Sequence, residues 1–197
     1  MADNGSPSVP GAVFAQQQIV LNVGCGYSAR QGLHPAFQGA EWHEVRLDID
    51  PAVNPDIICS ITDMRPIATS SIDAVWSSHN LEHLHRHEVP AALSEFIRVL
   101  RPGGQLLLTL PDLQRIAELV AGDGLEDEAY VSPSGPITPL DMIYGHTHSL
   151  ARGSQHMAHK TGFTARTLAQ LLAEAGFAGV TLHRDGFALW ARGYKPA

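Results

Sequence analysis

The sequence has little that would favour a nucleic-acid or membrane partner. It carries 13 Lys and Arg against 20 Asp and Glu, which gives a net charge of −7 at pH 7. Because nucleic-acid binding depends on clustered basic residues, we expect no nucleic-acid surface. No apolar stretch approaches the roughly 20 residues that a membrane-spanning helix needs, so we expect no membrane association either.

Cysteine is also scarce. Cys25 and Cys59 are the only two, which is too few for a disulfide framework, and their spacing is not typical of a metal site. Residues 1–18 lack the basic start and long apolar core of a signal peptide, and their composition is typical of a loose tail. These absences predict a cytoplasmic protein with a flexible N-terminal tail at 1–18.

The remaining length predicts a single domain over residues 19–197. The chain is 44% hydrophobic, which is enough for one core, and it is too short for two ordinary domains. Apolar runs typical of strands alternate with helical periodicity. We expect strands at 18–23, 44–49, 55–60, 72–77 and 105–110, helices at 88–101, 112–122 and 164–175, and a hairpin at 180–192. This alternation predicts a doubly wound, mostly parallel α/β sheet with an antiparallel C-terminal hairpin at its edge. Pro102-Gly103-Gly104 is expected to end the helix at 88–101.

Residues 123–162 do not follow that alternation. They contain Pro, Gly, Ser, His and Tyr without clean periodicity. Connections of this length within a compact domain are usually functional. We therefore expect a lid insertion at 123–162 that covers a substrate.

The strongest local signal is a glycine turn directly after the first strand. Gly24 and Gly26 are spaced by one residue, and Asp48 follows at the end of the second expected strand. In doubly wound sheets such a turn borders the ligand crevice, and an acid at the position of Asp48 binds ribose hydroxyls. Gly24, Gly26 and Ala29 also satisfy a dinucleotide pattern. However, Gly32 and Pro35 interrupt the helix that a pyrophosphate would need, which disfavours NAD.

Five segments in order resemble the class I S-adenosylmethionine-dependent methyltransferases, in particular the methyltransferase type 11 group. The segments are 22–26, 47–49, 72–84, 98–108 and 159–177, and 98–108 (Arg-Val-Leu-Arg-Pro-Gly-Gly with its following strand) is the most specific. The resemblance covers nearly all of 19–194. It implies a Rossmann-like fold and S-adenosylmethionine as cofactor, which carries no phosphate and tolerates a broken helix after the turn.

The resemblance also implies roles for individual residues. Gly24, Cys25 and Gly26 would approach the methionine part of the cofactor, Asp48 would hold the ribose, and Ile49 would pack on the adenine. The family usually places an acidic residue near the adenine edge, where this sequence has Ser60 or Ile61. Adenine recognition would then rest on the backbone and on Thr62 or Asp63. The residues assigned to the adenine edge are Ile61 and Thr62, and those assigned to the methionine end are Ser78 and His79.

Eleven histidines raise the question of a metal. One group comprises His79, His83, His85 and His87, and a second comprises His146, His148, His156 and His159. His79 and His83 have the i, i+4 spacing that a helix would align. Because zinc sites need three or four converging ligands and no glutamate or cysteine partner set is evident, we predict no metal.

We expect methyl transfer to a small-molecule acceptor, most readily to oxygen. A base that removes the acceptor's proton would assist, and His146, His159 and Tyr144 are the candidates. Two alternatives stay open: a nicotinamide-dependent oxidoreductase, and a non-catalytic scaffold that binds S-adenosylmethionine. The sequence does not indicate the acceptor or the oligomeric state.

Overall fold

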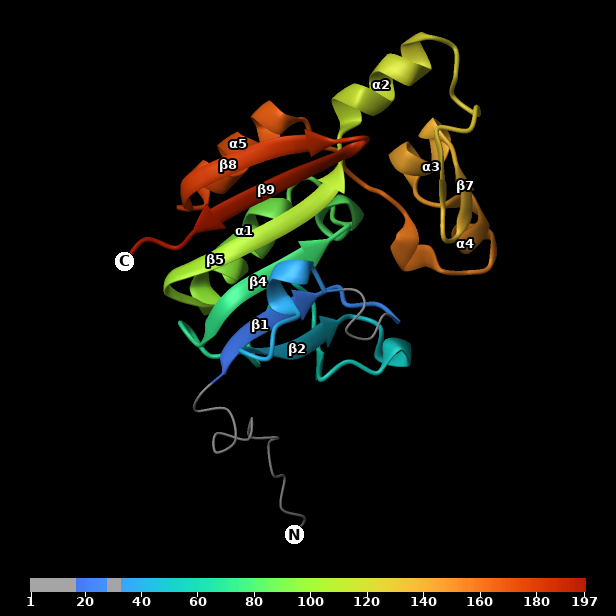
Figure 1. The fold of residues 1–197 in the computed structure, drawn as a ribbon. Helices are drawn as coiled ribbons and strands as arrows, with labels where there is room; N and C mark the ends of the chain where they lie inside the picture. Colours follow the sequence, from blue (N-terminus) through green and yellow to red (C-terminus); the bar gives the residue numbers. More distant parts are fainter. Residues whose placement is uncertain (1–16, 28–32) are drawn as a thin grey trace.

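The computed structural model describes residues 17–27 and 33–197. The expected tail up to residue 16 and Ala29 of the dinucleotide pattern lie outside that range. Seven strands form one sheet in the order β3-β2-β1-β4-β5-β9-β8 (Figure 1). The strands are β1 (Gln18–Val23), β2 (Trp42–Asp48), β3 (Ile57–Ile58), β4 (Ile72–Ser78), β5 (Leu100–Pro111), β8 (Ala178–Asp185) and β9 (Ala188–Tyr194). The first five are parallel, and β9 runs antiparallel between β5 and β8. The predicted fold class is confirmed.

Helices α1 (Val89–Val99) and α5 (Ala165–Glu174) pack on one face of the sheet. Their apolar sides contribute Phe96 and Leu172, which are fully buried against the sheet. Thr164 begins α5 with a capping box, and Asp112 caps α2 (Leu113–Ala121) by accepting the Gln114 N–H. Both predicted helix starts are therefore confirmed.

The segment Pro102-Gly103-Gly104 does not end the preceding helix. The helix ends at Val99, and Leu100 is already extended as the first residue of β5. Gly103 adopts a left-handed φ of +76°, and the register between β4 and β5 shifts at this point. The glycines therefore form an irregularity inside the strand, which is why β5 is longer than the predicted 105–110.

The order of the strands determines where a ligand can bind. From β1 the chain first builds β2 and β3 on one side, and then crosses back to build β4 and β5 on the other. Ligands of doubly wound sheets bind at such a reversal, beyond the carboxyl ends of the strands. In this protein Gly24 follows β1 and His79 follows β4, so both lie at that crevice.

Residues 123–162, here called the lobe, are folded rather than an irregular loop. They form β6 (Tyr130–Ser132), β7 (Gly135–Ile137), α3 (Pro139–Tyr144), α4 (Thr147–Ala151) and the 3-10 helix η5 (Gln155–Met157). Ile137 and Met142 of the lobe are buried against Ile116 of α2 in a small separate core. Figure 1 shows the lobe beside the carboxyl ends of the parallel strands. Among the described residues, none of the helices is long and apolar enough to cross a membrane.

Candidate functional site

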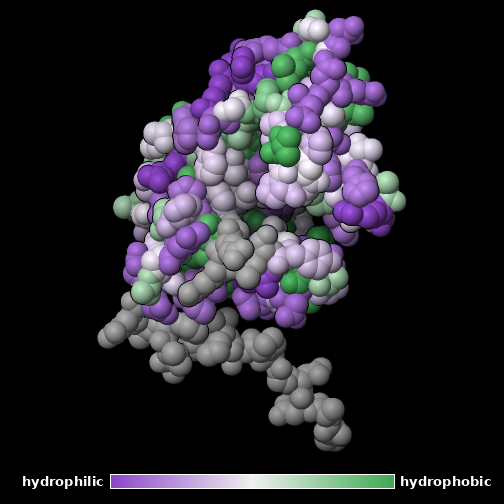
Figure 2. Space-filling model, turned by 45° about the vertical axis from the view of Figure 1, so that its right-hand side comes forward, coloured by the Kyte–Doolittle hydropathy of each residue, from purple (hydrophilic) through white to green (hydrophobic). Residues whose placement is uncertain are grey.

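Two adjoining cavities lie between the sheet and the lobe. The first, here called the turn cavity, has a volume of about 290 Å³ and is lined by the glycine turn, the end of β2 and the segment after β4. The second, the lobe cavity, measures about 210 Å³ and lies against α2 and α3. Lys160 lines both. In Figure 2 the surface is hollowed between the lobe and the part of the molecule beneath it.

The glycine turn needs both of its glycines, for different reasons. Gly24 (φ +62°) and Gly26 (φ +56°) both have left-handed backbones that side chains rarely adopt. A Cβ at position 24 would also lie 2.7 Å from the side chain of Asn80, whereas a Cβ at position 26 would meet nothing within 4 Å. Gly24 therefore lets Asn80 pack against the turn, and Gly26 leaves open space beside the cavity.

Asp48 and Arg46 of β2 hold this turn in place. Asp48 accepts the Gly26 N–H at 2.9 Å with one carboxylate oxygen and the Asp50 N–H at 3.0 Å with the other. The Arg46 guanidinium donates to the Gly26 carbonyl at 2.7 Å and to the Asn54 carbonyl at 3.0 Å. Because a carboxylate has about four acceptor positions, Asp48 keeps capacity for the two hydroxyls of a ribose. The carboxylate thus fits a nucleoside ligand.

The wall beyond Asp48 combines apolar and polar side chains. Ile49 lines the cavity with 53% of its surface exposed, which suits packing against a flat ring. Ile61 is buried, and the Ser60 hydroxyl pairs with that of Thr62 at 2.8 Å. Burial, with the charges of Asp63 and Glu95, raises the pKa of Cys59 to about 11. A thiol with a raised pKa is protonated at pH 7, so Cys59 contributes a neutral side chain to this wall.

The segment after β4 supplies the inner wall. His79 has a positive φ of +49°, and its N–H donates to the Thr109 carbonyl at 2.9 Å. Asn80 lines the turn cavity, and its buried side-chain nitrogen has no hydrogen-bond partner among the described residues. An unpaired buried donor beside a glycine turn fits a ligand that brings an acceptor group, such as a carboxylate. The turn cavity thus fits a nucleoside joined to an amino acid.

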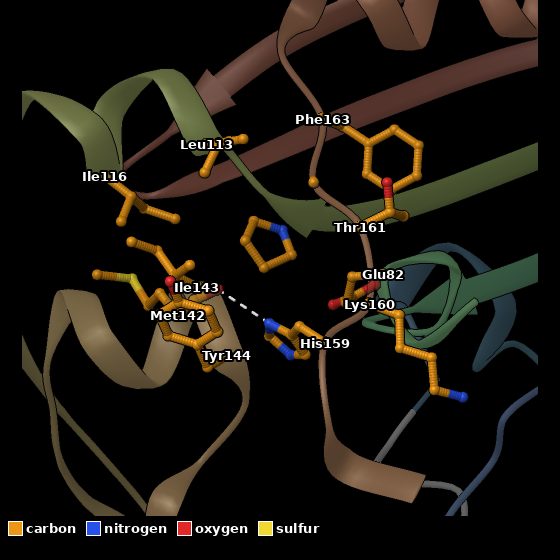
Figure 3. Close-up of a pocket in the computed structure, with 12 residues that line it drawn as sticks. Glu82, Leu113, Ile116, Met142, Ile143, Tyr144, His159, Lys160, Thr161 and Phe163 are labelled. Carbon is orange, nitrogen blue, oxygen red and sulfur yellow. Dashed lines mark hydrogen bonds between the residues drawn. The ribbon is translucent and has the colours of Figure 1, made fainter. Parts of the chain in front are cut away.

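The lobe cavity is mainly apolar, with a few polar groups at one side (Figure 3). Leu113, Ile116 and Met142 form its apolar wall, while Glu82 and His159 provide the polar side. Such a lining is typical of small-molecule sites. The His159 Nδ1 donates to the Met142 carbonyl at 2.9 Å. Burial lowers the pKa of His159, which favours a neutral imidazole with a free Nε2 lone pair at pH 7.

Glu82 lies at the boundary of the two cavities. It belongs to the 3-10 helix η4 (Leu81–His83), and only 2% of its side chain is exposed. One carboxylate oxygen pairs with the His79 Nδ1 at 3.1 Å. Burial opposes charge on both groups, but their hydrogen bond and opposite charges outweigh it. The pKa of His79 is therefore raised and the pKa of Glu82 is lowered.

The structure brings most of the predicted cofactor residues together. Those that line the turn cavity are Gly24, Gly26, Asp48, Ile49, Ile61 and His79. Cys25, Thr62 and Ser78 are not among the lining residues, and Cys25 is buried behind the turn. Sequence reasoning missed Asn80, although its place directly after β4 at the sheet reversal could have indicated it.

The predicted catalytic residues separate in space. His159 and Tyr144 line the lobe cavity. His146 lines neither of the two described cavities, and its Nδ1 lies 2.9 Å from the Ser149 hydroxyl. The helical i, i+4 alignment expected for His79 and His83 is wrong, because η4 is a single 3-10 turn that begins only at Leu81.

Comparisons with known proteins agree with this geometry. Residues 21–108 match the family model of the methyltransferase domain. A curated relative, malonyl-[acyl-carrier protein] O-methyltransferase of Laribacter hongkongensis (strain HLHK9), is 38% identical over 71 residues, which are 34% of this chain and 23% of the relative.

Solved structures show the same fold at low sequence identity. An O-methyltransferase family protein of Burkholderia thailandensis has a TM-score of 0.61 at 14% identity, over 94% of this chain and 53% of that one. The 1,6-didemethyltoxoflavin-N1-methyltransferase of the same organism, solved with S-adenosylhomocysteine, has a TM-score of 0.55 at 14% identity, over 92% and 72%. The chain therefore spans less than two thirds of the length of the curated relative and of the first of these structures.

Proposed function

We propose that this chain is a class I S-adenosylmethionine-dependent methyltransferase that transfers the cofactor's methyl group to an oxygen of a small molecule held in the lobe cavity. The observation that carries the proposal is the contact between two different cavities. One combines a glycine turn, a carboxylate and an unpaired amide donor, and the other is apolar with a single polar side.

In this proposal the residues of the turn cavity hold the cofactor. Asp48 accepts hydrogen bonds from the ribose hydroxyls, Ile49 packs against the adenine, and Asn80 donates to the methionine end. S-adenosylmethionine bound there would supply an electrophilic methyl group, whose bond to sulfur would break as the acceptor oxygen bonds to the carbon, with S-adenosylhomocysteine left behind.

The lobe side prepares the acceptor. The neutral imidazole of His159 has its Nε2 lone pair free to take the acceptor's hydroxyl proton. Tyr144 lies at the same cavity with 61% of its surface exposed, and it would orient the acceptor. The lobe excludes water and aligns acceptor, methyl and sulfur. Oxygen as the target is supported by the O-methyltransferase activity in the name of the curated relative.

The test has two stages. Calorimetry should show binding of S-adenosylhomocysteine, with a rise in melting temperature that grows with its concentration, and no binding of NAD. Purified protein with S-adenosylmethionine should then release S-adenosylhomocysteine in the presence of one or more members of a panel of small alcohols, phenols and carboxylic acids. Binding of NAD alone would indicate the oxidoreductase. Cofactor binding without turnover across the panel would favour the non-catalytic scaffold.

A further inference from the structure

Three side chains able to bind a metal converge where the two cavities meet. Glu82, His83 and His159 each offer one ligand atom, and these atoms lie within 4.8 Å of one another. The rings of His83 and His159 have centroids 4.9 Å apart, although the residues come from η4 and from the end of the lobe. Figure 3 shows Glu82 and His159 close together at the edge of the lobe cavity.

The two histidines are oriented in the same way. The His83 Nδ1 lies 3.1 Å from the Ala158 carbonyl oxygen, and the His159 Nδ1 lies 2.9 Å from the Met142 carbonyl oxygen. A carbonyl oxygen only accepts, so each Nδ1 donates, which leaves each Nε2 as the atom that can bind a metal. Metal-binding histidines are held in this way, by a hydrogen bond from the second ring nitrogen to a backbone carbonyl or a carboxylate.

Glu82 supplies an independent observation. Its side chain is 98% buried, and while one oxygen pairs with His79, the other has no hydrogen-bond partner among the described residues. A buried, unpaired oxygen of a charged group destabilises a fold. A bound cation would satisfy that oxygen.

We propose that Glu82, His83 and His159 bind one divalent transition-metal ion of the Zn²⁺ or Co²⁺ class. Two imidazoles and one carboxylate form a known ligand set for such ions, with positions left open for a further ligand. Ligand atoms about 2.1 Å from an ion lie roughly 3–4 Å from one another, so side-chain shifts of about 1 Å would close the site. This replaces the sequence-based expectation of no metal, which treated the two histidine groups separately.

The location indicates a role for the ion. Glu82 and His159 line the lobe cavity, so an open position of the ion can receive the acceptor oxygen. The ion would lower the pKa of the acceptor's hydroxyl group, and the proton would leave to water. His159 would then be a ligand and not the base. This role rests on the proposed function, whereas metal binding itself does not.

The test is a titration of the chelator-treated 197-residue chain with Zn²⁺ by calorimetry and with Co²⁺ by visible absorption. We expect one ion per chain and a Co²⁺ spectrum of low coordination number. Glu82→Gln, His83→Gln and His159→Gln should each weaken binding at least a hundredfold, which exceeds the 10–100-fold typical of removing a group behind a ligand.

The matched control is the double variant with His85→Gln and His87→Gln. These two exposed rings stack with centroids 5.7 Å apart, so they offer a surface histidine pair to adventitious metal. The double variant should bind like the native chain. Absence of binding to the native chain would overturn the proposal, as would loss of binding in the control while Glu82→Gln and His159→Gln bind normally.

Two further results separate this proposal from the proposed function. Native protein that binds S-adenosylhomocysteine but no metal would reject the ion and leave methyl transfer standing. Protein that binds one ion through these three residues but neither S-adenosylhomocysteine nor S-adenosylmethionine would support the ion and reject the function.

Discussion

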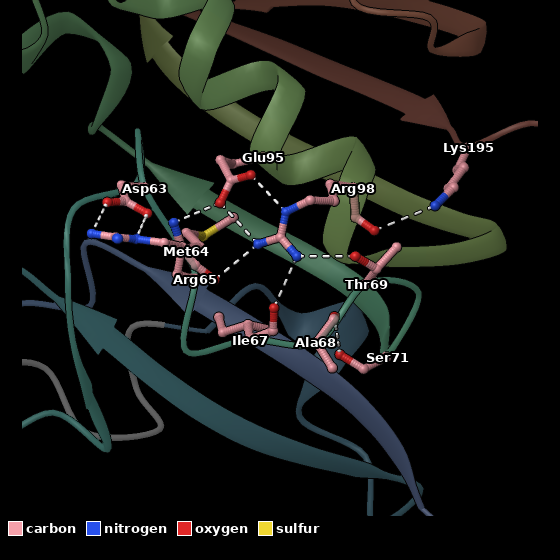
Figure 4. Close-up of polar contacts among 10 residues, drawn as sticks. All are labelled: Asp63, Met64, Arg65, Ile67, Ala68, Thr69, Ser71, Glu95, Arg98 and Lys195. Atoms are coloured by element: carbon pink, nitrogen blue, oxygen red, sulfur yellow. Dashed lines mark hydrogen bonds and ion pairs between the residues drawn. The ribbon is translucent and has the colours of Figure 1, made fainter.

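Two polar clusters in this molecule differ in how completely their charged groups are hydrogen-bonded. In the first, all five N–H donors of Arg98 have acceptors: both oxygens of Glu95, the carbonyls of Met64 and Ile67, and the Thr69 hydroxyl (Figure 4). The second, here called the Glu82 cluster, consists of Glu82, His79, His83 and His159. In it one buried carboxylate oxygen of Glu82 has no partner among the described residues.

The difference indicates what each cluster does. Arg98 on α1 fastens the segment 64–69, which leads into β4, and a fully paired group has no capacity left for a ligand. Glu82 lines the lobe cavity and keeps an unpaired carboxylate oxygen, as groups that meet a ligand do. We therefore assign the Arg98 cluster to stability and the Glu82 cluster to function.

The largest expected effect is on stability, from Arg98→Ala. It would leave two carbonyls without their donor and the largely buried Glu95 carboxylate with the Met64 N–H as its remaining donor, and we expect a loss of about 2–3 kcal/mol in the free energy of unfolding. Urea denaturation measures it, and affinity for S-adenosylhomocysteine should stay within twofold. The control is Arg115→Ala, which removes a half-exposed pair with Glu118 and should change stability by less than about 0.5 kcal/mol. Equal losses of unfolding free energy in Arg98→Ala and Arg115→Ala would mean that the paired Arg98 cluster stabilises the fold no more than an exposed ion pair does.

Asp48→Ala should act in the opposite sense, on binding more than on stability. Because hydrogen bonds to a charged group are lost, the binding free energy of S-adenosylhomocysteine, measured by calorimetry, should become less favourable by about 1.5–3 kcal/mol. The free energy of unfolding should fall by only about 1 kcal/mol, because the Gly26 and Asp50 amides lose one acceptor each at a partly solvated edge.

The control for Asp48 is Asp50→Ala. Asp50 caps the 3-10 helix η3 (Pro51–Val53), and it does not line the turn cavity. Its replacement should leave affinity nearly unchanged. If it weakened binding more than Asp48→Ala, the ribose carboxylate would be misassigned.

Glu82→Gln should change the stability of the fold much less than Arg98→Ala does. In metal-free protein we expect the free energy of unfolding to change by less than about 1 kcal/mol, because the amide oxygen still accepts from His79 and a buried charge is removed. Thermal and urea unfolding beside Arg98→Ala would measure this. A loss above about 2 kcal/mol would place Glu82 with Arg98 as a structural group.

Sequence patterns drew attention to single residues of both clusters, such as Arg98 and His159, but did not show which side chains each cluster brings together. Arg98 lies in the most specific family segment, yet its contacts hold the fold, since a recurrent motif can reflect packing as well as chemistry. The strands, and the position of Asp48 at the end of the second strand, were predictable because hydrophobic alternation and turn position are local signals. The pairing of His83 with His159 was not, because it depends on how the whole lobe folds back onto η4.

The smallest expected effect is a pH dependence that belongs to the Arg98 cluster alone. The hydrogen bond from Arg98 is the main cause that holds the pKa of Glu95 below its usual value, against the opposing effect of burial. A carboxyl group whose pKa is lower in the folded state stabilises the fold above its unfolded pKa, near 4.3, and loses that contribution as pH falls through the folded value. The native chain should therefore exceed Glu95→Gln in free energy of unfolding by a margin that is constant above about pH 5 and shrinks below about pH 4.

Urea denaturation of both proteins between pH 3 and pH 7 measures that margin. The control is Glu118→Gln at the exposed Arg115 pair, which should show almost no margin. A margin that stays constant down to pH 3 would mean that the charge of Glu95 contributes nothing, and the Arg98 cluster would then act through its carbonyl contacts alone.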